Sequence, residues 1–156
     1  LVKSGLLPYG NFEDATETSP TLFYNDADQH VAKMVETRIA NTNSPWLAGV
    51  EVGDVYAIPV SHGEGKFVVT DEEFAELRDN GQIFSQYVDF DGKPSMDSKY
   101  NPNGSVNAIE GITSKNGQII GKMGHSERYE DGLFQNIPGN KDQHLFRSAV
   151  EYFTKA

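Results

Sequence analysis

The sequence predicts an α/β domain, and three observations carry this prediction. Apolar runs at residues 55–60 and 119–123 are short and nearly continuous, which is typical of buried strands. Amphipathic stretches that begin near residues 70 and 142 predict two helices. The predicted strands outnumber the helices, so the residues alone leave open whether the domain is α/β or α+β.

The composition is that of one globular domain without a thiol. The 156 residues are enough to bury a core, and 37% of them are hydrophobic. The formal net charge of −10 argues against nucleic acid as a partner, because the phosphates would repel the chain. No run of 18 apolar residues predicts a membrane-spanning helix, and residues 1–8 lack the features of a signal peptide. The absence of cysteine excludes disulfides, zinc–thiolate sites and a cysteine nucleophile within these residues.

Several segments of the first 90 residues predict regular structure. Residues 1–7 are expected to be the last turn of a helix, stopped by the proline that follows. Alternating side chains at residues 31–42 predict a strand, and residues 55–60 predict a second one. Residues 67–69 and 82–90 predict two more strands.

Local signals also mark the helices. Thr70 and Glu73 form a capping box, in which each side chain accepts a hydrogen bond from the backbone N–H of the other residue. The second helix is expected at residues 142–153, with one apolar face packed on the sheet. The side chains of that face are Phe146, Ala149, Val150 and Phe153.

A β-hairpin is predicted from residues 106–113 and 118–123. The turn between them contains Asn116 and Gly117, a pair that supplies the positive φ angles of a tight turn. We therefore expect the second strand of this hairpin to end where the residues after 123 begin.

His125 and Glu127 follow that strand and form the first candidate site. If strand geometry continues, their side chains point to the same side, because alternate residues share a face. An imidazole beside a carboxylate is the base and orienter of a nucleophile–base–orienter site. Judged by spacing alone, a surface loop that happens to hold these two residues is the simpler interpretation.

The second candidate is the loop of His62, Gly63 and Glu64. The glycines around this loop allow the backbone to approach a substrate or another loop closely. His62 either frames a substrate pocket or holds a turn from the core side, and the residues leave both interpretations open. A metal site that combines this loop with His125 and Glu127 is disfavoured, because no pair of histidines has helical ligand spacing.

Five short motifs are spread over almost the whole chain. They are residues 4–8 (SGLLP), 44–47 (SPWL), 59–67 (PVSHGEGKF), 101–105 (NPNGS) with 109–112 (IEGI), and 123–128 (MGHSER). In this order they resemble the glutaminase domain of phosphoribosylformylglycinamidine synthases, which is a class I glutamine amidotransferase. One such motif would be weak, but five in the order of the family make a specific signal.

The resemblance implies a flavodoxin-like amidotransferase fold with a mixed sheet, a hairpin and a C-terminal helix. It assigns His125 as the base that takes a thiol proton and Glu127 as the residue that orients its ring. Glutamine would be the substrate, framed by the loop of His62, Gly63 and Glu64. The cysteine would precede residue 1, so residues 1–156 are expected to be the C-terminal portion of the domain, without its first strands and nucleophile elbow, and inactive alone.

The resemblance also implies partners and a compartment. The ammonia would feed an ATP-dependent synthase, so ATP and Mg²⁺ are expected in that other domain and no cofactor in this one. The partner would be the remainder of a parent synthase chain in the cytoplasm, with no membrane involved. The excursion at residues 87–100 resembles the long form, in which the glutaminase is part of one large polypeptide.

Two departures from the family, the missing cysteine and the residues beside the histidine, leave alternatives open. The family usually has proline on both sides of the catalytic histidine, whereas Gly124 and Ser126 stand here, and the loss of two fixed φ angles is expected to loosen the loop. A non-catalytic binding or docking module is therefore the alternative function. A hydrolase with Ser61 or Ser126 as nucleophile is disfavoured, because neither lies in a Gly-x-Ser-x-Gly elbow. A sheet without its first strands would also favour a homodimer through its exposed edge.

Overall fold

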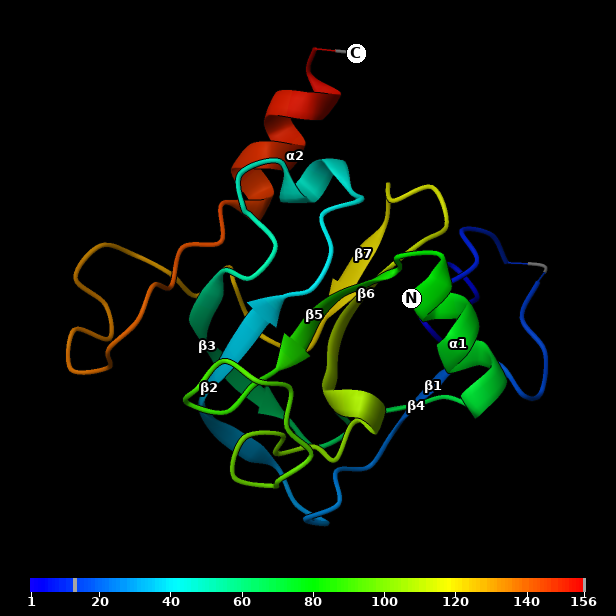
Figure 1. Ribbon diagram of the computed structural model, residues 1–156, viewed down its shortest axis with the longest axis horizontal. Helices are drawn as coiled ribbons and strands as arrows, with labels where there is room; N and C mark the ends of the chain where they lie inside the picture. Colours follow the sequence, from blue (N-terminus) through cyan, green and yellow to red (C-terminus); the bar gives the residue numbers. More distant parts are fainter. Residues whose placement is uncertain (13, 156) are drawn as a thin grey trace.

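The computed structural model describes residues 1–12 and 14–155, and its centre is a curled five-stranded sheet (Figure 1). The strands have the order β3-β2-β5-β6-β7, and a separate ribbon contains β1 and β4. The strands are β1 (Thr21–Phe23), β2 (Val31–Ile39), β3 (Val55–His62), β4 (Lys66–Val68), β5 (Ile83–Tyr87), β6 (Ile109–Thr113) and β7 (Ile120–Lys122). The strands predicted from the sequence are confirmed, although several are shorter than expected.

The pairing within the sheet departs from the expected mixed arrangement. Every pair of named strands is antiparallel. The parallel component is an isolated bridge between Tyr56 and Asn140. For β6 and β7 the short connection explains this, because parallel neighbours require a crossover of a dozen or more residues and residues 114–119 alone join these two strands.

Two α-helices and two short 3-10 helices flank the sheet. They are α1 (Asp71–Asp79), α2 (Leu145–Phe153), η1 (Pro45–Leu47) and η2 (Val106–Ala108). The helices α2 and η1 pack together at one end of the molecule, whereas α1 lies beside the β1–β4 ribbon (Figure 1).

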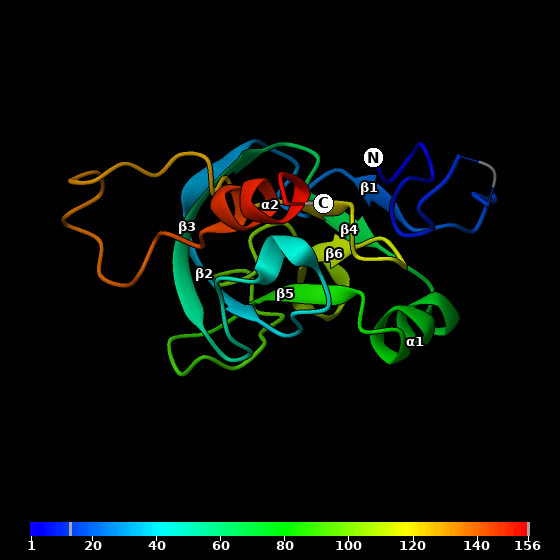
Figure 2. The same ribbon diagram turned by 90° about the horizontal axis from the view of Figure 1, so that it is seen from above.

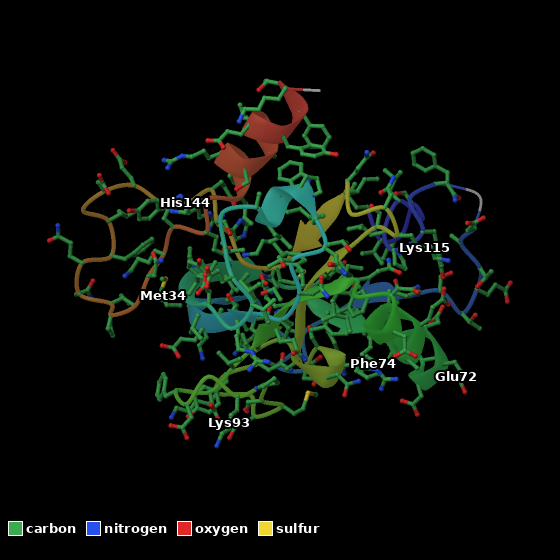
Figure 3. The ribbon with its side chains drawn as sticks, turned by 45° about the horizontal axis from the view of Figure 1, so that its top comes forward. Met34, Glu72, Phe74, Lys93, Lys115 and His144 are labelled. Atoms are coloured by element: carbon green, nitrogen blue, oxygen red, sulfur yellow. The ribbon has the colours of Figure 1, made fainter. Side chains whose placement is uncertain are left out.

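The helix α1 begins as its sequence predicts. The Thr70 hydroxyl accepts the N–H of Glu73 over 3.2 Å, and the Glu73 carboxylate accepts the N–H of Thr70 over 3.5 Å. The capping box is therefore confirmed. Figure 3 shows Glu72 on the outer side of α1, while Phe74 packs against a buried cluster that contains Leu77.

The sheet curls until the segment after β7 meets β3 (Figure 2). Gly124 forms an antiparallel bridge with Val60, and the His125 N–H donates to the Pro59 carbonyl over 2.8 Å. Pro59 has no backbone N–H, but its carbonyl can still accept this hydrogen bond at the edge of the sheet. The curl therefore fixes the backbone of His125 against the strand that ends at His62.

Two local predictions, for residues 1–7 and for the hairpin turn, need correction. Residues 2–9 form turns and no α-helix, although Gly5 has the positive φ, 81°, with which helices commonly end. In the hairpin, Gly117 has a positive φ of 70°, but Asn116 has not. The connection is a six-residue loop closed by a 2.9 Å hydrogen bond from the Ser114 N–H to the Ile119 carbonyl, so the two-residue turn geometry does not apply.

The position and buried face of α2 also differ from the prediction. His144 has a φ of 53°, so the helix begins at Leu145 and not at residue 142. The buried side chains are Leu145, Ser148 and Ala149. Of the four apolar residues predicted to face the sheet, only Ala149 is buried, because α2 packs on η1 instead. The exposed apolar residues are Phe146, Val150 and Phe153.

Leu145 and Phe146, which are neighbours in α2, test which face of this helix is buried. Leu145 is 3% exposed and Phe146 is 55% exposed. Leu145→Ala should lower the free energy of unfolding by about 2–5 kcal/mol, because it opens a cavity in the core. Phe146→Ala, the matched control, should lower it by less than about 1 kcal/mol, because it removes one exposed ring contact with Trp46. Urea unfolding measures both, and a larger effect at Phe146 would contradict the assignment.

Candidate active site

His125 and Glu127 face each other where the chain leaves β7. The Nδ1 atom of His125 lies 2.7 Å from Oε1 of Glu127. An ionised carboxylate only accepts hydrogen bonds, so the ring nitrogen that faces it carries the proton. In the neutral ring, Nε2 of His125 then keeps its lone pair and can act as a base. The two side chains meet as predicted, but they do so in a turn closed by the Arg128 N–H and the His125 carbonyl, not in a continued strand.

The environment keeps Glu127 ionised. Burial raises the pKa of Glu127, but hydrogen bonds with its own backbone N–H and with His125 outweigh this effect, and the net pKa lies below the ordinary 4.5. Arg128 acts in the same direction, with its Nε 3.9 Å from Glu127 Oε1. The carboxylate is therefore available to hold the His125 ring at neutral pH.

A cavity of about 250 Å³ opens beside this pair, between the end of β7 and α2. Its polar lining comes from the His125 segment and its apolar lining from η1 and α2. The lining includes Trp46, Ile120, Lys122, His125, Glu127 and Phe146. A small polar substrate could therefore reach the imidazole from this side.

The structure brings one of the three loop candidates close to His125. His62 ends β3, and its two ring nitrogens are buried and lack a hydrogen-bond partner among the described residues. Burial lowers the pKa of His62, the Asn103 side chain opposes this shift, and the nearby His125 adds to it. Glu64 is exposed, and the space beside Gly63 is open. His62 therefore lies near the candidate base, whereas Gly63 and Glu64 form the outer part of the loop.

Asn25 shapes this loop, and sequence reasoning missed it. Its side-chain Nδ2 donates to the His62 carbonyl over 2.7 Å, and its Oδ1 accepts the Gly65 N–H over 2.9 Å. Its backbone N–H donates to the Gly63 carbonyl over 2.9 Å. A Cβ on Gly65 would lie 1.8 Å from Cδ2 of His62, so only glycine leaves room for the ring. The sequence signal was the glycine pair alone, since Asn25 is distant along the chain.

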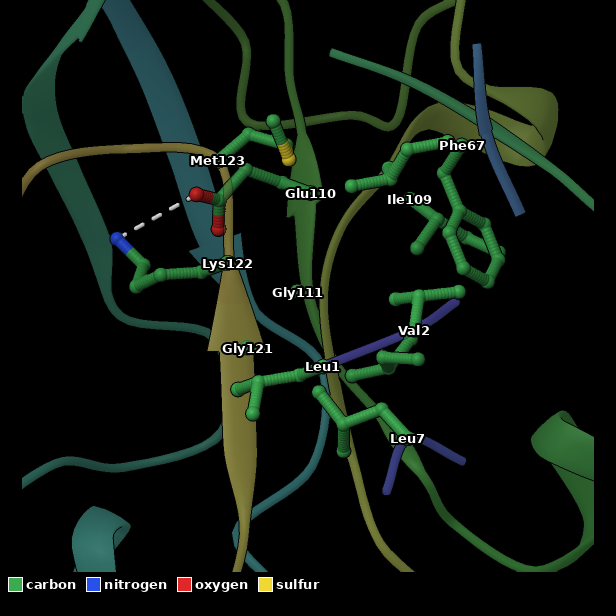
Figure 4. A pocket seen from close by; sticks show the side chains of 12 residues that line it. Leu1, Val2, Leu7, Phe67, Ile109, Glu110, Gly111, Gly121, Lys122 and Met123 are labelled. Atoms are coloured by element: carbon green, nitrogen blue, oxygen red, sulfur yellow. Dashed lines mark ion pairs between the residues drawn. The ribbon is translucent and has the colours of Figure 1, made fainter. Parts of the chain in front are cut away.

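A buried ion pair of Glu110 and Lys122, shown in Figure 4, lies next to the segment that contains His125. Glu110 of β6 and Lys122 of β7 approach to 3.4 Å, and their side chains are 0% and 10% exposed. Burial lowers the pKa of Lys122, and the Glu110 carboxylate opposes this shift. The same carboxylate accepts the N–H of Gly124 over 2.6 Å. Sequence reasoning did not select either charged residue as part of the site.

Ser126 is tied to the same pair and not to the imidazole. Lys122 Nζ donates to Ser126 Oγ and to Gln143 Oε1, both over 2.9 Å, and Ser126 Oγ donates to Gln143 Oε1 over 2.5 Å. The other serine considered as a nucleophile, Ser61, has its Oγ 3.1 Å from Nε2 of the exposed residue His30. These hydrogen bonds connect neither serine hydroxyl to His125, so the His125–Glu127 pair does not serve either serine as a base.

Residues 1–12 and 14–155 contain neither a metal-binding cluster nor a membrane-spanning helix. No group of three or more histidine, aspartate or glutamate side chains gathers there in a way that could hold a metal ion. In the same part of the chain, no helix is long and apolar enough to cross a membrane.

Comparison with known proteins decides the family. Residues 1–153 match the model of the CobB/CobQ-like glutamine amidotransferase domain. The chain belongs to this family. It is similar to the phosphoribosylformylglycinamidine synthase subunit PurQ of Thermomicrobium roseum, with 39% identity over 110 residues, which cover 70% of this chain and 46% of that protein. The PurQ subunit of Gloeobacter violaceus is 32% identical over 150 residues, which cover 96% of this chain and 58% of that one.

A solved structure shares the fold of this chain. The structure of PurLQS from Thermotoga maritima matches with a TM-score of 0.63 and 24% identity, and it covers 86% of this chain and 53% of that chain. The likeness confirms the expected amidotransferase-like α/β fold. The chain spans about half the length of the curated relatives that it matches.

The lowered pKa of His62 predicts a loss of stability in acid. The folded chain binds this proton at a lower pH than the unfolded chain, whose reference pKa is 6.5. As the pH falls below about 6.5, the unfolded state takes up the proton first and the free energy of unfolding decreases. Urea unfolding at about pH 7.5 and about pH 5.5 measures this slope.

His62→Gln should make that slope smaller, because glutamine does not titrate. A His62→Gln variant with an unchanged pH dependence would show that His62 does not contribute to it.

Proposed function

We propose that this chain supplies the base and the orienter of a glutaminase site in a phosphoribosylformylglycinamidine synthase. The observation that carries the proposal is the 2.7 Å contact between His125 Nδ1 and Glu127 in a chain of the glutamine amidotransferase family. This contact leaves Nε2 of the neutral ring free to take a proton. The relatives named as synthase subunits support the choice of this synthase.

The proposed reaction needs a cysteine thiol from outside these 156 residues, which contain none. His125 takes the thiol proton, and the thiolate attacks the side-chain carboxamide of glutamine. The tetrahedral adduct collapses to a glutamyl thioester as ammonia leaves with a proton from His125. His125 then removes a proton from water, which attacks the thioester and releases glutamate and the thiol. Glu127 holds Nδ1 throughout and stabilises the charged ring.

The loop of His62 would border the glutamine pocket. His62 lies close to the candidate base. The two nitrogens of its ring are buried and make no hydrogen bond of good geometry among the described residues. The exposed Glu64 and the open space at Gly63 suit the rim of that pocket. We therefore assign His62 to the pocket wall and Gly63 and Glu64 to its outer edge.

The wider assignment follows from the same proposal. Residues 1–156 would be the C-terminal portion of the glutaminase domain of a long single-chain synthase, with the remainder of that chain as partner. The excursion at residues 87–100, within which Val88 and Pro94 form an antiparallel bridge, supports the long form through its resemblance to that form. ATP and Mg²⁺ would act in the synthase domain, which forms the amidine with the ammonia, and the whole would work in the cytoplasm.

A non-catalytic docking module remains the second candidate. Gly124 and Ser126 favour it, because they stand in place of the two family prolines. The strand β7 has a strand partner on one side only, which also favours a homodimer through that edge. Light scattering that finds only a monomer at micromolar concentration would contradict the homodimer.

Ammonia release from glutamine tests the glutaminase function. The 156-residue chain alone should show background rates, because it has no thiol. In a longer protein that carries the cysteine, His125→Ala should lower kcat by roughly 10²–10⁴-fold. The exposed Glu130→Gln, in the following loop, is the control and should keep full activity. Full activity of His125→Ala would contradict the proposal, and no activity of the longer protein itself would favour the docking module.

A further inference from the structure

We propose that Glu110, Lys122 and Gln143 are positioning residues that hold His125 in place of the missing prolines. They fix the backbone before and after the imidazole through a buried hydrogen-bonded network. The catalytic meaning of this network rests on the proposed function. The arrangement of the network itself can be tested without activity.

The residue before His125 is held by Glu110. Its carboxylate accepts the Gly124 N–H over 2.6 Å, a bond that proline could not make because it lacks this hydrogen. A Cβ at position 124 would lie 2.6 Å from Cγ2 of Ile58 and 2.9 Å from Oε1 of Glu110. Glycine is therefore the residue that fits over the buried carboxylate, and the hydrogen bond supplies the restraint that a proline ring would give.

The residue after His125 is held by Lys122 and Gln143. Ser126 Oγ lies within hydrogen-bond distance of both, at 2.9 Å from Lys122 Nζ and 2.5 Å from Gln143 Oε1. The backbone N–H of His125 itself donates to Pro59. Three successive residues are thus restrained by Glu110, by Pro59, and by Lys122 together with Gln143, so the chain is held on both sides of the imidazole.

The ion pair joins the two restraints into one unit. Lys122 contacts the carboxylate that holds Gly124 and also the hydroxyl of Ser126. Both charges are almost fully buried, so each depends on the other for compensation, and separating them is costly. Oε2 of Glu110 and Nε2 of Gln143 are buried without a hydrogen-bond partner among the described residues, so the bonds that the network does make are the ones that compensate these buried groups. A shift of the loop on one side of His125 would therefore disturb the other side as well.

The test uses paired variants and nuclear magnetic resonance. The double variant Glu110→Leu, Lys122→Met replaces both buried charges by apolar groups of similar size, an exchange that buried ion pairs often tolerate. The matched control is Glu76→Leu, Lys115→Met, which removes an exposed pair 3.1 Å apart. Two signals are measured: hydrogen exchange of the Gly124 amide, and the proton resonance of His125 Nδ1–H in ¹⁵N-edited spectra.

In the double variant, exchange at Gly124 should be faster by roughly 10–100-fold, as expected for loss of a hydrogen bond to a charged acceptor. The Nδ1–H resonance should broaden or disappear, while amides of β2 keep their exchange rates. The control should match the original chain in both signals. A folded double variant with unchanged Gly124 exchange and an unchanged Nδ1–H resonance would overturn the proposal.

A second variant decides the question if the double variant does not fold. Ser126→Ala removes one hydroxyl that is half-buried, and it should weaken the His125 Nδ1–H resonance while the melting temperature changes little. An unchanged resonance in folded Ser126→Ala would then overturn the proposal. Neither signal requires glutaminase activity, so an inactive protein whose His125 is held in this way would contradict the proposed function alone.

Discussion

The closure of the sheet at Gly124 and His125 is the constraint on which the candidate site depends. The chain leaves β7, crosses to β3 and pairs with Pro59 and Val60, so the curl of the sheet places the imidazole. Neither β3 nor β7 could do this alone, because a strand end is free to fray. The closing segment also brings His125 near His62, although 63 positions separate them in sequence numbering.

That closure passes over a buried charge, and this explains the residues around the histidine. Glu110 would be an unfavourable residue inside an apolar sheet without Lys122 and the Gly124 N–H as partners. With them, the carboxylate becomes a fixed acceptor beneath the loop. From the sequence, Gly124 is expected to make the loop less stiff. In the structure, a larger residue at this position would not fit above that carboxylate. On the proposal made above, the hydrogen bonds of Glu110 and Lys122 supply the rigidity of this loop.

The parts of the fold that sequence predicted are those set by local chemistry. The Thr70–Glu73 capping box, the alternation of β2 and the facing of His125 and Glu127 depend on residues a few positions apart. The prediction for the buried face of α2 was wrong because the packing partner of this helix, η1, lies about 100 residues earlier in the chain. The periodicity of an amphipathic helix shows that an apolar face exists, but it does not show how much of that face is covered.

The Glu110–Lys122 pair had a signal that sequence reasoning did not use. Glu110 and Lys122 interrupt two apolar segments that were already predicted to pair as a hairpin, and they carry opposite charges. Opposite charges on neighbouring strands predict a contact. Their burial could not be predicted in this way, because it arises from the curl of the whole sheet. The same holds for Asn25, whose bonds to the His62 loop cross almost 40 positions of sequence.

The most direct test of the account is the position of the proton on the neutral ring of His125. ¹⁵N chemical shifts of the two ring nitrogens in the unmodified chain report it at a pH where the ring is neutral. The contact with Glu127 predicts a protonated Nδ1 and a bare Nε2, which is the form that can accept a thiol proton. A ring that carries its proton on Nε2 would contradict the account, because Glu127 would then not orient His125 as a base.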